Sequence, residues 1–247
     1  MRSSLIAGNW KMNGNLQSAI ELVEGIAAGD AGKALLAVCP PAVYLMKVGG
    51  MLAQSKIALG AQNVCDRESG AFTGEIAASM LKECGCRYAI VGHSERRALY
   101  GESDQMVAAR FAMAVQAGIT PILCVGETLD ERESGVTEAV VARQIDATID
   151  VNGIEGIAQS VIAYEPVWAI GTGKVASPEQ AQAVHAFIRD RLAQLDSEIA
   201  QQVQILYGGS MNPANAAELL SQSDIDGGLI GGAALKADDF LAIAQAV

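Results

Sequence analysis

Positive charge is scarce in this sequence. Among its 247 residues, Lys and Arg total 17 against 28 Asp and Glu, which gives a formal net charge of −11 at pH 7. Nucleic-acid binding depends on clustered cations that neutralise phosphates, and an anionic membrane surface makes the same demand. We therefore expect neither as a partner. An anionic small molecule remains compatible with this composition, because a few cations gathered in one cleft can concentrate it.

Long apolar runs are also missing. No stretch approaches the roughly 20 residues that a membrane-spanning helix needs. The N-terminus begins Met1-Arg2-Ser3-Ser4 and lacks the apolar core and small-residue cleavage site of a secretory signal. We expect a cytoplasmic protein with no membrane partner.

The cysteines form no pattern that predicts a disulfide framework. Their number is odd and their spacing is scattered: Cys39, Cys65, Cys84, Cys86 and Cys124. The pair Cys84-Gly85-Cys86 would suggest a metal site only beside a second Cys pair or a His cluster, and the chain has two His in all. We expect structural thiols and no metal.

Aromatic residues are few, at 4% of the chain, although hydrophobic residues reach 51%. Val, Ile, Leu and Ala must therefore fill the core, as in parallel strands that are covered on both faces. Short apolar runs of this kind recur along the whole sequence, each bounded by Gly, Pro or Asn. They are Leu5–Trp10, Ala34–Cys39, Ile57–Gln62, Tyr88–Gly92, Pro121–Gly126, Val161–Tyr164, Val203–Tyr207 and Gly228–Ile230.

Amphipathic segments separate these runs. The clearest begins at Ser177, a good N-cap that is followed by Pro178 at the first helical position and by Gln180 at the capping-box position. The apolar stripe of this segment consists of Ala181, Val184, Ile188, Leu192 and Leu195. Two further segments have a similar pattern, Gln105–Gln116 and Glu138–Asp150.

The alternation of strands and helices predicts an α/β fold with a parallel sheet. Because crossovers are right-handed, eight such units can close into a (β/α)8 TIM barrel, and we expect a single domain over residues 1–247. An open doubly wound sheet is the alternative, but no Gly-rich dinucleotide turn follows the first strand. The irregular stretch from Asn63 to about Ile76 predicts a functional loop or an interface element.

Polar and Gly-rich segments follow several of the predicted strands. In a barrel of this kind the active site lies at the C-terminal ends of the strands. A carboxylate, an imidazole, an ammonium group and two Gly-rich turns are therefore expected at one mouth. The segments are Asn9-Trp10-Lys11, His93-Ser94-Glu95, Glu165, Gly208-Gly209-Ser210 and Gly231-Gly232.

Each of these side chains also has a structural interpretation. Taken alone, Glu165 is equally compatible with a structural ion pair, although its place directly after Val-Ile-Ala-Tyr puts it at the barrel rim. A lone His is usually a satisfied core residue, but His93 follows an apolar strand and is expected to be functional. His185 lies on the capped helix and is expected at the surface or in packing. Lys11, beside Asn9 at a strand end, is better placed to meet an anion than to be a solvated charge.

The Gly pairs predict a phosphate site. Backbone N–H groups can bind phosphate only where no side chain blocks a close approach. Barrels often place a phosphate between the loops after strands seven and eight, where Gly209-Ser210 and Gly231-Gly232 lie. Gly171-Thr172-Gly173 would add a third group of donors, from a loop that is able to move.

Six long segments carry a resemblance that covers the chain in order: Gly8–Asn13, Gly60–Asn63, Gly70–Glu75, Ile90–Arg97, Ala163–Lys174 and Tyr207–Ser210. With them the chain closely resembles the triosephosphate isomerase family. The resemblance implies an intramolecular aldose–ketose isomerase of glycolysis and gluconeogenesis, which interconverts dihydroxyacetone phosphate and D-glyceraldehyde 3-phosphate with no metal or organic cofactor.

The resemblance also implies the residue roles. Glu165 would be the base that transfers a proton through an enediolate, and His93 the electrophile. Asn9 and Lys11 would bind the substrate. Gly171, Ser210, Gly231 and Gly232 would hold the phosphate, with Ser94 and Glu95 as support.

Elementary chemistry favours the same division of roles. An enediolate needs electrostatic stabilisation, which a neutral His93 can give as a hydrogen-bond donor. A short helix starting at Ser94 would disfavour imidazolium. The loop from Pro166 to Ala176 would act as a lid that excludes water from the intermediate. The family more often has Thr where this chain has Val175, which is also β-branched, so we expect the hinge to work.

The loop after the third strand departs from the family at Cys65-Asp66-Arg67. In the family this loop inserts into a second subunit, with Thr73 reaching toward the partner's active-site rim. We expect a homodimer with Thr73 and Glu75 at the interface.

Two other functions compete with the isomerase. A barrel aldolase, or another phosphosugar enzyme, is the first. A Schiff-base aldolase needs a Lys inside the barrel, and no predicted strand contains one. A catalytically inactive barrel that serves as a binding or scaffold protein is the second, and the complete set of Asn9, Lys11, His93 and Glu165 argues against it.

Overall fold

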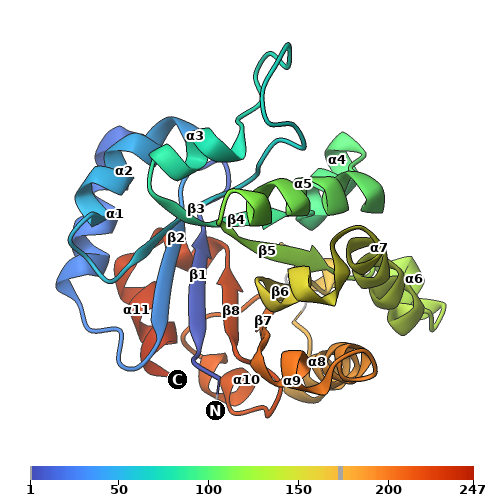
Figure 1. Ribbon diagram of the computed structural model, residues 1–247. Helices are drawn as coiled ribbons and strands as arrows, with labels where there is room; N and C mark the ends of the chain where they lie inside the picture. Colours follow the sequence, from blue (N-terminus) through green and yellow to red (C-terminus); the bar gives the residue numbers. More distant parts are fainter. Residues whose placement is uncertain (1, 172–174) are drawn as a thin grey trace.

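The strands of this protein form a closed parallel barrel, surrounded by helices (Figure 1). The computed structural model describes residues 2–171 and 175–247. Each strand pairs with the next in the chain, and β8 pairs with β1. The predicted TIM barrel is confirmed. Its strands are β1 (Leu5–Asn9), β2 (Leu35–Cys39), β3 (Ala58–Ala61), β4 (Cys86–Val91), β5 (Thr120–Val125), β6 (Val161–Tyr164), β7 (Gln204–Tyr207) and β8 (Gly227–Ile230).

At least one α-helix follows each strand in the chain, and the helices cover the outside of the barrel. Short 3-10 helices are η1 (Ala42–Tyr44), η2 (Val167–Ala169) and η3 (Gly232–Leu235). The α-helices are α1 (Leu16–Ala28), α2 (Leu45–Leu52), α3 (Ala78–Glu83), α4 (Ser94–Tyr100), α5 (Asp104–Gln116), α6 (Leu129–Glu133), α7 (Thr137–Ala158), α8 (Pro178–Ala193), α9 (Ser197–Gln202), α10 (Ala216–Leu220) and α11 (Ala237–Gln245). Across the described ranges, none of them combines the length and the hydropathy that crossing a membrane requires.

The predicted helix at Ser177 is confirmed together with its cap. The Ser177 side chain accepts a hydrogen bond from the Gln180 N–H, and the Gln180 side chain accepts one from the Ser177 N–H. The predicted stripe is wrong at its last member, since α8 ends at Ala193 and Leu195 is 52% exposed.

Helix α7 consists of two helical stretches that meet at Gly153. The backbone there is not helical, with φ at 67° and ψ at 170°, so the first stretch ends close to the predicted end at Asp150 and a short second stretch continues to Ala158. Glycine adopts this conformation at little cost. The change of direction also breaks the apolar period on which the sequence prediction depends.

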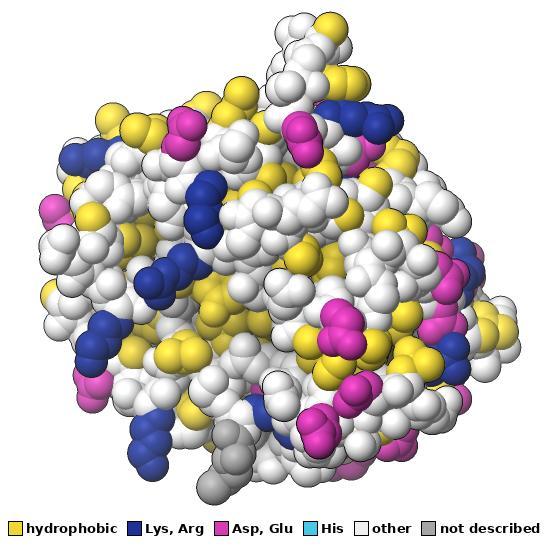
Figure 2. Space-filling view, in the orientation of Figure 1, with side chains coloured by type: hydrophobic (Ala, Val, Ile, Leu, Met, Phe, Trp, Pro, Cys, Tyr) yellow, Lys and Arg dark blue, Asp and Glu magenta, His cyan; other side chains and the backbone are white. Residues whose placement is uncertain are grey.

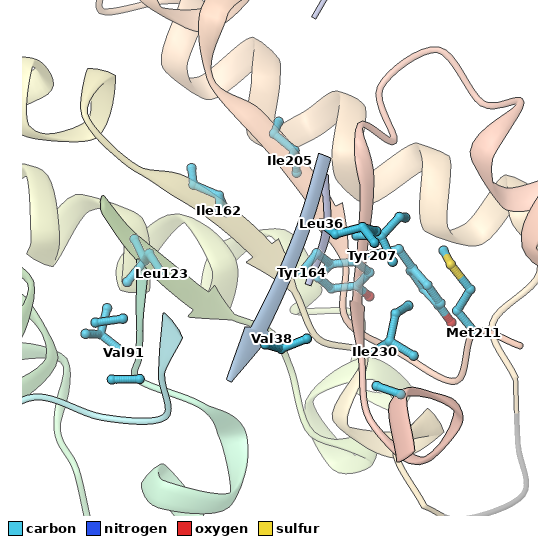
Figure 3. Packing of buried hydrophobic residues seen from close by; sticks show 14 of the residues in the cluster. Leu36, Val38, Val91, Leu123, Ile162, Tyr164, Ile205, Tyr207, Met211 and Ile230 are labelled. Carbon is cyan, nitrogen blue, oxygen red and sulfur yellow. The ribbon is translucent and has the colours of Figure 1, made fainter. Parts of the chain in front are cut away.

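Alternate residues of each strand enter two separate apolar layers. Val38, Leu123 and Ile162 belong to the outer layer between strands and helices, where Figure 3 shows them projecting from their strands. The inner layer fills the barrel with small residues, among them Ala37 and Ala163, and an equal share of larger ones such as Leu206. This period of two is what a strand covered on both faces requires.

The inner register carries two predicted site residues to the barrel mouth. Val161 and Ala163 point into the barrel, so Glu165, two residues further, follows the same direction beyond the strand end. Leu5 and Ala7 place Asn9 in the same way at the end of β1. Position along the strand and side-chain direction together therefore bring these polar groups to one end of the barrel.

The loop between β3 and α3 stands away from the barrel body (Figure 1). It corresponds to the predicted irregular stretch from Asn63 to about Ile76. Figure 2 shows hydrophobic side chains on this projecting loop, and its Phe72 is 45% exposed. Its foot is held by the buried Arg110, whose guanidinium donates to the Val64 carbonyl oxygen and pairs with the Glu75 carboxylate at 3.2 Å.

A buried ion-pair network closes the side of the barrel opposite the mouth. Arg189 of α8 pairs with Asp224 at 2.6 Å and with Asp226 at 2.7 Å, and it also donates to the Ala200 carbonyl oxygen. Arg2 reaches the other oxygen of Asp226 at 2.6 Å. The network joins α8 and α9 to the entry of β8.

We expect Arg189→Met to lower the free energy of unfolding by about 3–5 kcal/mol, because the substitution leaves buried carboxylates without their partner. Arg191→Met on the same helix is the matched control, since Arg191 pairs with Asp146 at 2.7 Å with both side chains 34% exposed, and such pairs contribute about 0–1 kcal/mol. Urea unfolding at one fixed protein concentration measures both. Equal losses in the two variants would contradict this account of the network.

Candidate active site

Lys11 stands at the mouth in a left-handed backbone conformation. Its φ is 51°, the one positive φ of a non-glycine residue in the described part of the chain. Two side chains hold this turn: Asn9 accepts from the Lys11 N–H at 3.0 Å, and Gln62 donates to the Lys11 carbonyl oxygen at 2.8 Å. Gln62 also donates to the Cys39 carbonyl oxygen at 2.9 Å. Such a conformation costs about 1–3 kcal/mol and is typical of functional sites.

The ammonium group of Lys11 lies over the mouth. Its Nζ pairs with Glu95 Oε1 at 2.5 Å, and both side chains are partly exposed. A Cβ on Gly231 would lie 3.5 Å from Lys11 Cε, so the Lys11 stem runs beside the turn after β8. The predicted cation and one predicted phosphate turn are therefore neighbours.

His93 is the N-cap of α4. Its Nδ1 accepts a hydrogen bond from the Glu95 N–H at 3.2 Å, so Nδ1 carries no proton and the geometry assigns the proton to Nε2. Burial lowers the pKa of His93, whereas the neighbouring Glu165 carboxylate raises it, and the net direction is upward. The Glu95 N–H opposes a second proton on the ring, since a protonated Nδ1 cannot accept.

Glu165 is 1% exposed and lies against His93. Its Oε2 accepts from the Ser94 N–H at 2.8 Å. Its Oε1 lies 2.9 Å from His93 Nε2, although the two groups are not aligned as a hydrogen bond. Burial raises the pKa of Glu165, but His93 and the Ser94 N–H outweigh it, and the pKa is lowered. The carboxylate is therefore ionised, and its two contacts restrain it.

Two glycines give the Glu165 backbone and side chain their room. A Cβ on Gly126, after β5, would lie 1.7 Å from the Glu165 carbonyl oxygen, and one on Gly208, after β7, would lie 2.9 Å from Glu165 Cγ. Any larger residue at either position displaces the carboxylate. Gly208 belongs to a predicted turn, whereas the need for Gly126 follows only from the pairing of β5 with β6.

One of the predicted phosphate turns contacts the start of the expected lid. Ser210 Oγ donates to the Ala169 carbonyl oxygen at 2.8 Å, which joins the turn after β7 to η2. Among the described residues, a Cβ added to Gly232 would meet no atom within 4 Å, so the backbone there is open to approach. Gly171 adopts a φ of 68°. Thr172, Gly173 and Lys174 of the expected lid lie outside the described residues.

Glu127 is a site residue that the sequence analysis missed. It is fully buried, accepts from Tyr164 Oη at 3.1 Å and from Trp168 Nε1 at 2.9 Å, and pairs with Arg132 at 3.0 Å. It thereby anchors η2, at the start of the expected lid, to the end of β5. The sequence did contain a signal for this residue, because Glu127 is a carboxylate two residues beyond the end of a buried strand.

Asn9, Lys11, His93 and Glu95 line one cleft of about 570 Å³, which extends toward the projecting loop. Glu165, on the other hand, borders a second cleft, of about 520 Å³. In the part of the chain that the structure describes, no three His, Cys, Asp or Glu side chains gather in a way that would hold a metal ion. All five cysteines are free thiols.

His185 lies apart from this cleft. It is fully buried, its ring packs edge-on against Tyr164, and its Nδ1 lies 3.1 Å from the Asp224 carbonyl oxygen. Burial lowers the pKa of His185 to about 4. Of the two expectations for this residue, packing is confirmed.

Comparison with known proteins agrees with this geometry. A family model described as triosephosphate isomerase matches residues 4–247. The proteins named triosephosphate isomerase from Thiobacillus denitrificans and Dechloromonas aromatica are 61% and 60% identical to this chain, each over 100% of this chain and 99% of its own length. The one from Hydrogenovibrio crunogenus is 59% identical over 100% of this chain and 98% of its own length. The chain therefore belongs to the triosephosphate isomerase family.

Proposed function

We propose that this protein interconverts dihydroxyacetone phosphate and D-glyceraldehyde 3-phosphate in the cytoplasm, as a glycolytic and gluconeogenic enzyme. The observation that carries the proposal is the buried pair of Glu165 and His93, with 2.9 Å between Oε1 and Nε2, at a mouth that also holds Lys11. A carboxylate base, a neutral donor and a cation are what proton transfer beside a carbonyl group requires.

Glu165 is the base. It removes a proton from the hydroxyl-bearing carbon next to the carbonyl group, which leaves an enediolate. A proton then passes from the hydroxyl oxygen to the former carbonyl oxygen, and Glu165 returns its proton to the neighbouring carbon. The contacts with Ser94 and His93 stabilise its ionised form and lower its basicity. Release from both, as the carboxylate turns toward the substrate carbon, restores the basicity that the reaction needs.

His93 stabilises the enediolate from the other side. Its Nε2–H donates to the developing oxyanion, and its Nδ1 stays occupied by the Glu95 N–H. Once the Glu165 carboxylate has turned away, the influence that raises the pKa of His93 weakens, and burial keeps the ring neutral. Lys11 adds positive charge beside the anionic substrate, while Asn9 fixes the turn that presents it.

The phosphate group is held by backbone donors at Gly171, Ser210, Gly231 and Gly232. The support for this assignment is the open backbone of Gly232 and the closeness of Gly231 to the Lys11 stem. The Ser210–Ala169 hydrogen bond couples that site to the lid. The reaction needs no metal and no organic cofactor, because Glu165 accepts the proton, His93 stabilises the oxyanion and Lys11 offsets the charge of the substrate.

A coupled assay with each triose phosphate, in the presence of EDTA, tests this function against the barrel aldolase. We expect interconversion in both directions. We also expect no change in protein mass when protein and substrate are treated together with borohydride, since none of the strands β1 to β8 contains a Lys for a Schiff base. A reduced covalent adduct, or no turnover with either substrate, would refute the isomerase.

The active form is a homodimer. Large apolar side chains surround the cleft and the projecting loop, including Met12 at 95% exposure, Leu99 at 73% and Tyr100 at 69%. Exposed apolar groups in one contiguous area mark an interface. The cleft is open beside the loop's own Gly74 and Glu75, so the loop of a second copy, with Thr73 near its tip, is the occupant that this surface fits.

We expect Thr73→Arg to dissociate the dimer, because a buried charge without a partner is costly at an interface. Sedimentation should give the wild type at twice the 25.6 kDa chain mass and the variant at the single mass, with low activity that rises with concentration. Gln159→Arg, at the exposed end of α7, is the matched control and should stay dimeric. A fully active wild-type monomer would overturn the dimer.

A further inference from the structure

Arg97 of α4 lies behind the catalytic pair and binds three separate elements. Its Nε donates to the Gly92 carbonyl oxygen at 2.8 Å, and its Nη2 donates to the Cys124 carbonyl oxygen of β5 at 3.3 Å. Its Nη1 pairs with Asp104, at the start of α5, at 2.6 Å. The side chain is 17% exposed, so these contacts take the place of most of its hydration.

The first contact acts on the turn that carries His93. Gly92 adopts a φ of 70°, and a Cβ there would lie 2.7 Å from Val107 and 3.0 Å from Arg97 Nη2. The turn is thus closely packed between α5 and the guanidinium group of Arg97. Because His93 is the next residue, the position of its ring follows from where the Gly92 carbonyl group is held.

The second contact acts on the wall beside Glu165. Cys124 is fully buried in the inner layer of the barrel. The Glu165 carboxylate is close enough to the Cys124 thiol to raise its pKa, together with the larger effect of burial. The strand residue whose carbonyl oxygen Arg97 binds is therefore a neighbour of the base.

We propose that Arg97 is a positioning residue for the reaction, which sets the placement of His93 relative to Glu165 by tying the Gly92 and Cys124 carbonyl groups to one planar guanidinium. The inference rests on the proposed function. A guanidinium is suited to this task because its donors diverge in a fixed plane, whereas the ammonium of Lys is a point charge.

Arg97 reaches these groups from outside the cleft that holds Asn9 and Lys11. It lines a second cleft, of about 520 Å³, which Cys124, Glu165 and Arg143 also border. Its hydrogen bonds and its ion pair involve neither Asn9 nor Lys11, the proposed substrate-binding groups. A change at Arg97 should therefore alter kcat, which depends on the relative positions of base and electrophile, and leave KM, which depends on the groups that bind the substrate.

The experiment is Arg97→Ala, assayed with and without guanidinium ion at millimolar, non-denaturing concentration. We expect kcat to fall by about 100-fold, the usual cost of a 1 Å misplacement, with KM nearly unchanged. Guanidinium can enter the second cleft and should restore much of kcat, whereas methylammonium at the same ionic strength should not. The ring resonances of His93 in NMR spectra should shift in the variant and return with guanidinium.

Arg143→Ala is the matched control. Arg143 borders the same cleft and pairs with the same Asp104 at 3.4 Å, but it is 60% exposed and has no carbonyl contact in the described structure. We expect unchanged kcat and no response to guanidinium. Arg97→Lys keeps a positive charge beside Asp104 and tests the proposal if Arg97→Ala fails to fold. Its kcat should fall, and guanidinium should not restore it.

Wild-type kcat in folded Arg97→Ala or Arg97→Lys, or a loss in Arg97→Ala that guanidinium does not reverse, would overturn the proposal. So would His93 resonances that do not move. The NMR measurement does not depend on turnover. It therefore tests the positioning role of Arg97 even if the wild type proves to have no isomerase activity and the proposed function is refuted.

Discussion

Glu165→Asp is expected to lower kcat by about 100-fold or more and to leave KM almost unchanged. The substitution keeps the carboxylate but shortens it by one methylene, and a 1 Å misplacement of a reacting group costs about 10²-fold. The backbone cannot compensate, because Gly126 and Gly208 already lie against Glu165 with no space for movement. Glu165→Gln, which has no base at all, should lose about 10²–10⁴-fold.

Steady-state kinetics in both directions measures this effect. Glu155→Asp, an exposed carboxylate on α7, receives the same chemical change far from the mouth and should behave as the wild type. If Glu165→Asp retained wild-type kcat, Glu165 would not be the base.

Lys11→Met should produce the second large effect, a loss in kcat/KM. Lys11 pairs with the substrate anion, and removing one partner of a charge pair that binding buries costs about 2–5 kcal/mol, which corresponds to between about 30-fold and several thousand-fold. The loss should lie toward the upper end, because the variant also leaves Glu95, now paired with Lys11 at 2.5 Å, as a free negative charge beside an anionic substrate.

Raising the salt concentration should therefore recover part of the Lys11→Met activity, since screening weakens repulsion between exposed charges. Lys56→Met, at an exposed position before β3, removes the same charge from the opposite end of the barrel and serves as the control. Unchanged kcat and KM in Lys11→Met would remove Lys11 from the site.

The residues that sequence reasoning placed well are those whose position follows from a regular strand. Glu165 continues the inward series of Val161 and Ala163, and Asn9 continues that of Leu5 and Ala7. The period of two and the rule that barrel sites lie at strand ends were enough to bring them together. Ser177 was placed equally well, because a capping box is local in sequence.

The residues that it missed act through contacts between distant segments. Gln62 holds Lys11 across 51 positions, and Arg97 binds Cys124 across 27. Glu127 meets Trp168 across 41. No periodicity reports which carbonyl group a side chain will find once the barrel has closed, and the left-handed Lys11 turn depends on such contacts.

The second stretch of α7 was missed for a different reason. Gly153 normally predicts a helix end, and the first stretch does end there, but the chain turns directly into a second helical stretch that continues to Ala158. Whether a second stretch forms depends on what the later residues pack against, and Ile157 is fully buried in the outer layer.

The most direct test of the central claim is isomerisation in D2O. If Glu165 takes a proton from one carbon and returns it to the next, the carboxylic acid can exchange its proton with solvent, and the glyceraldehyde 3-phosphate formed from dihydroxyacetone phosphate should carry deuterium at C2 in proton NMR spectra. Glu165→Gln should form neither labelled nor unlabelled product at a comparable rate. Product that keeps only its original hydrogen at every time point would show a hydride shift and would contradict the account.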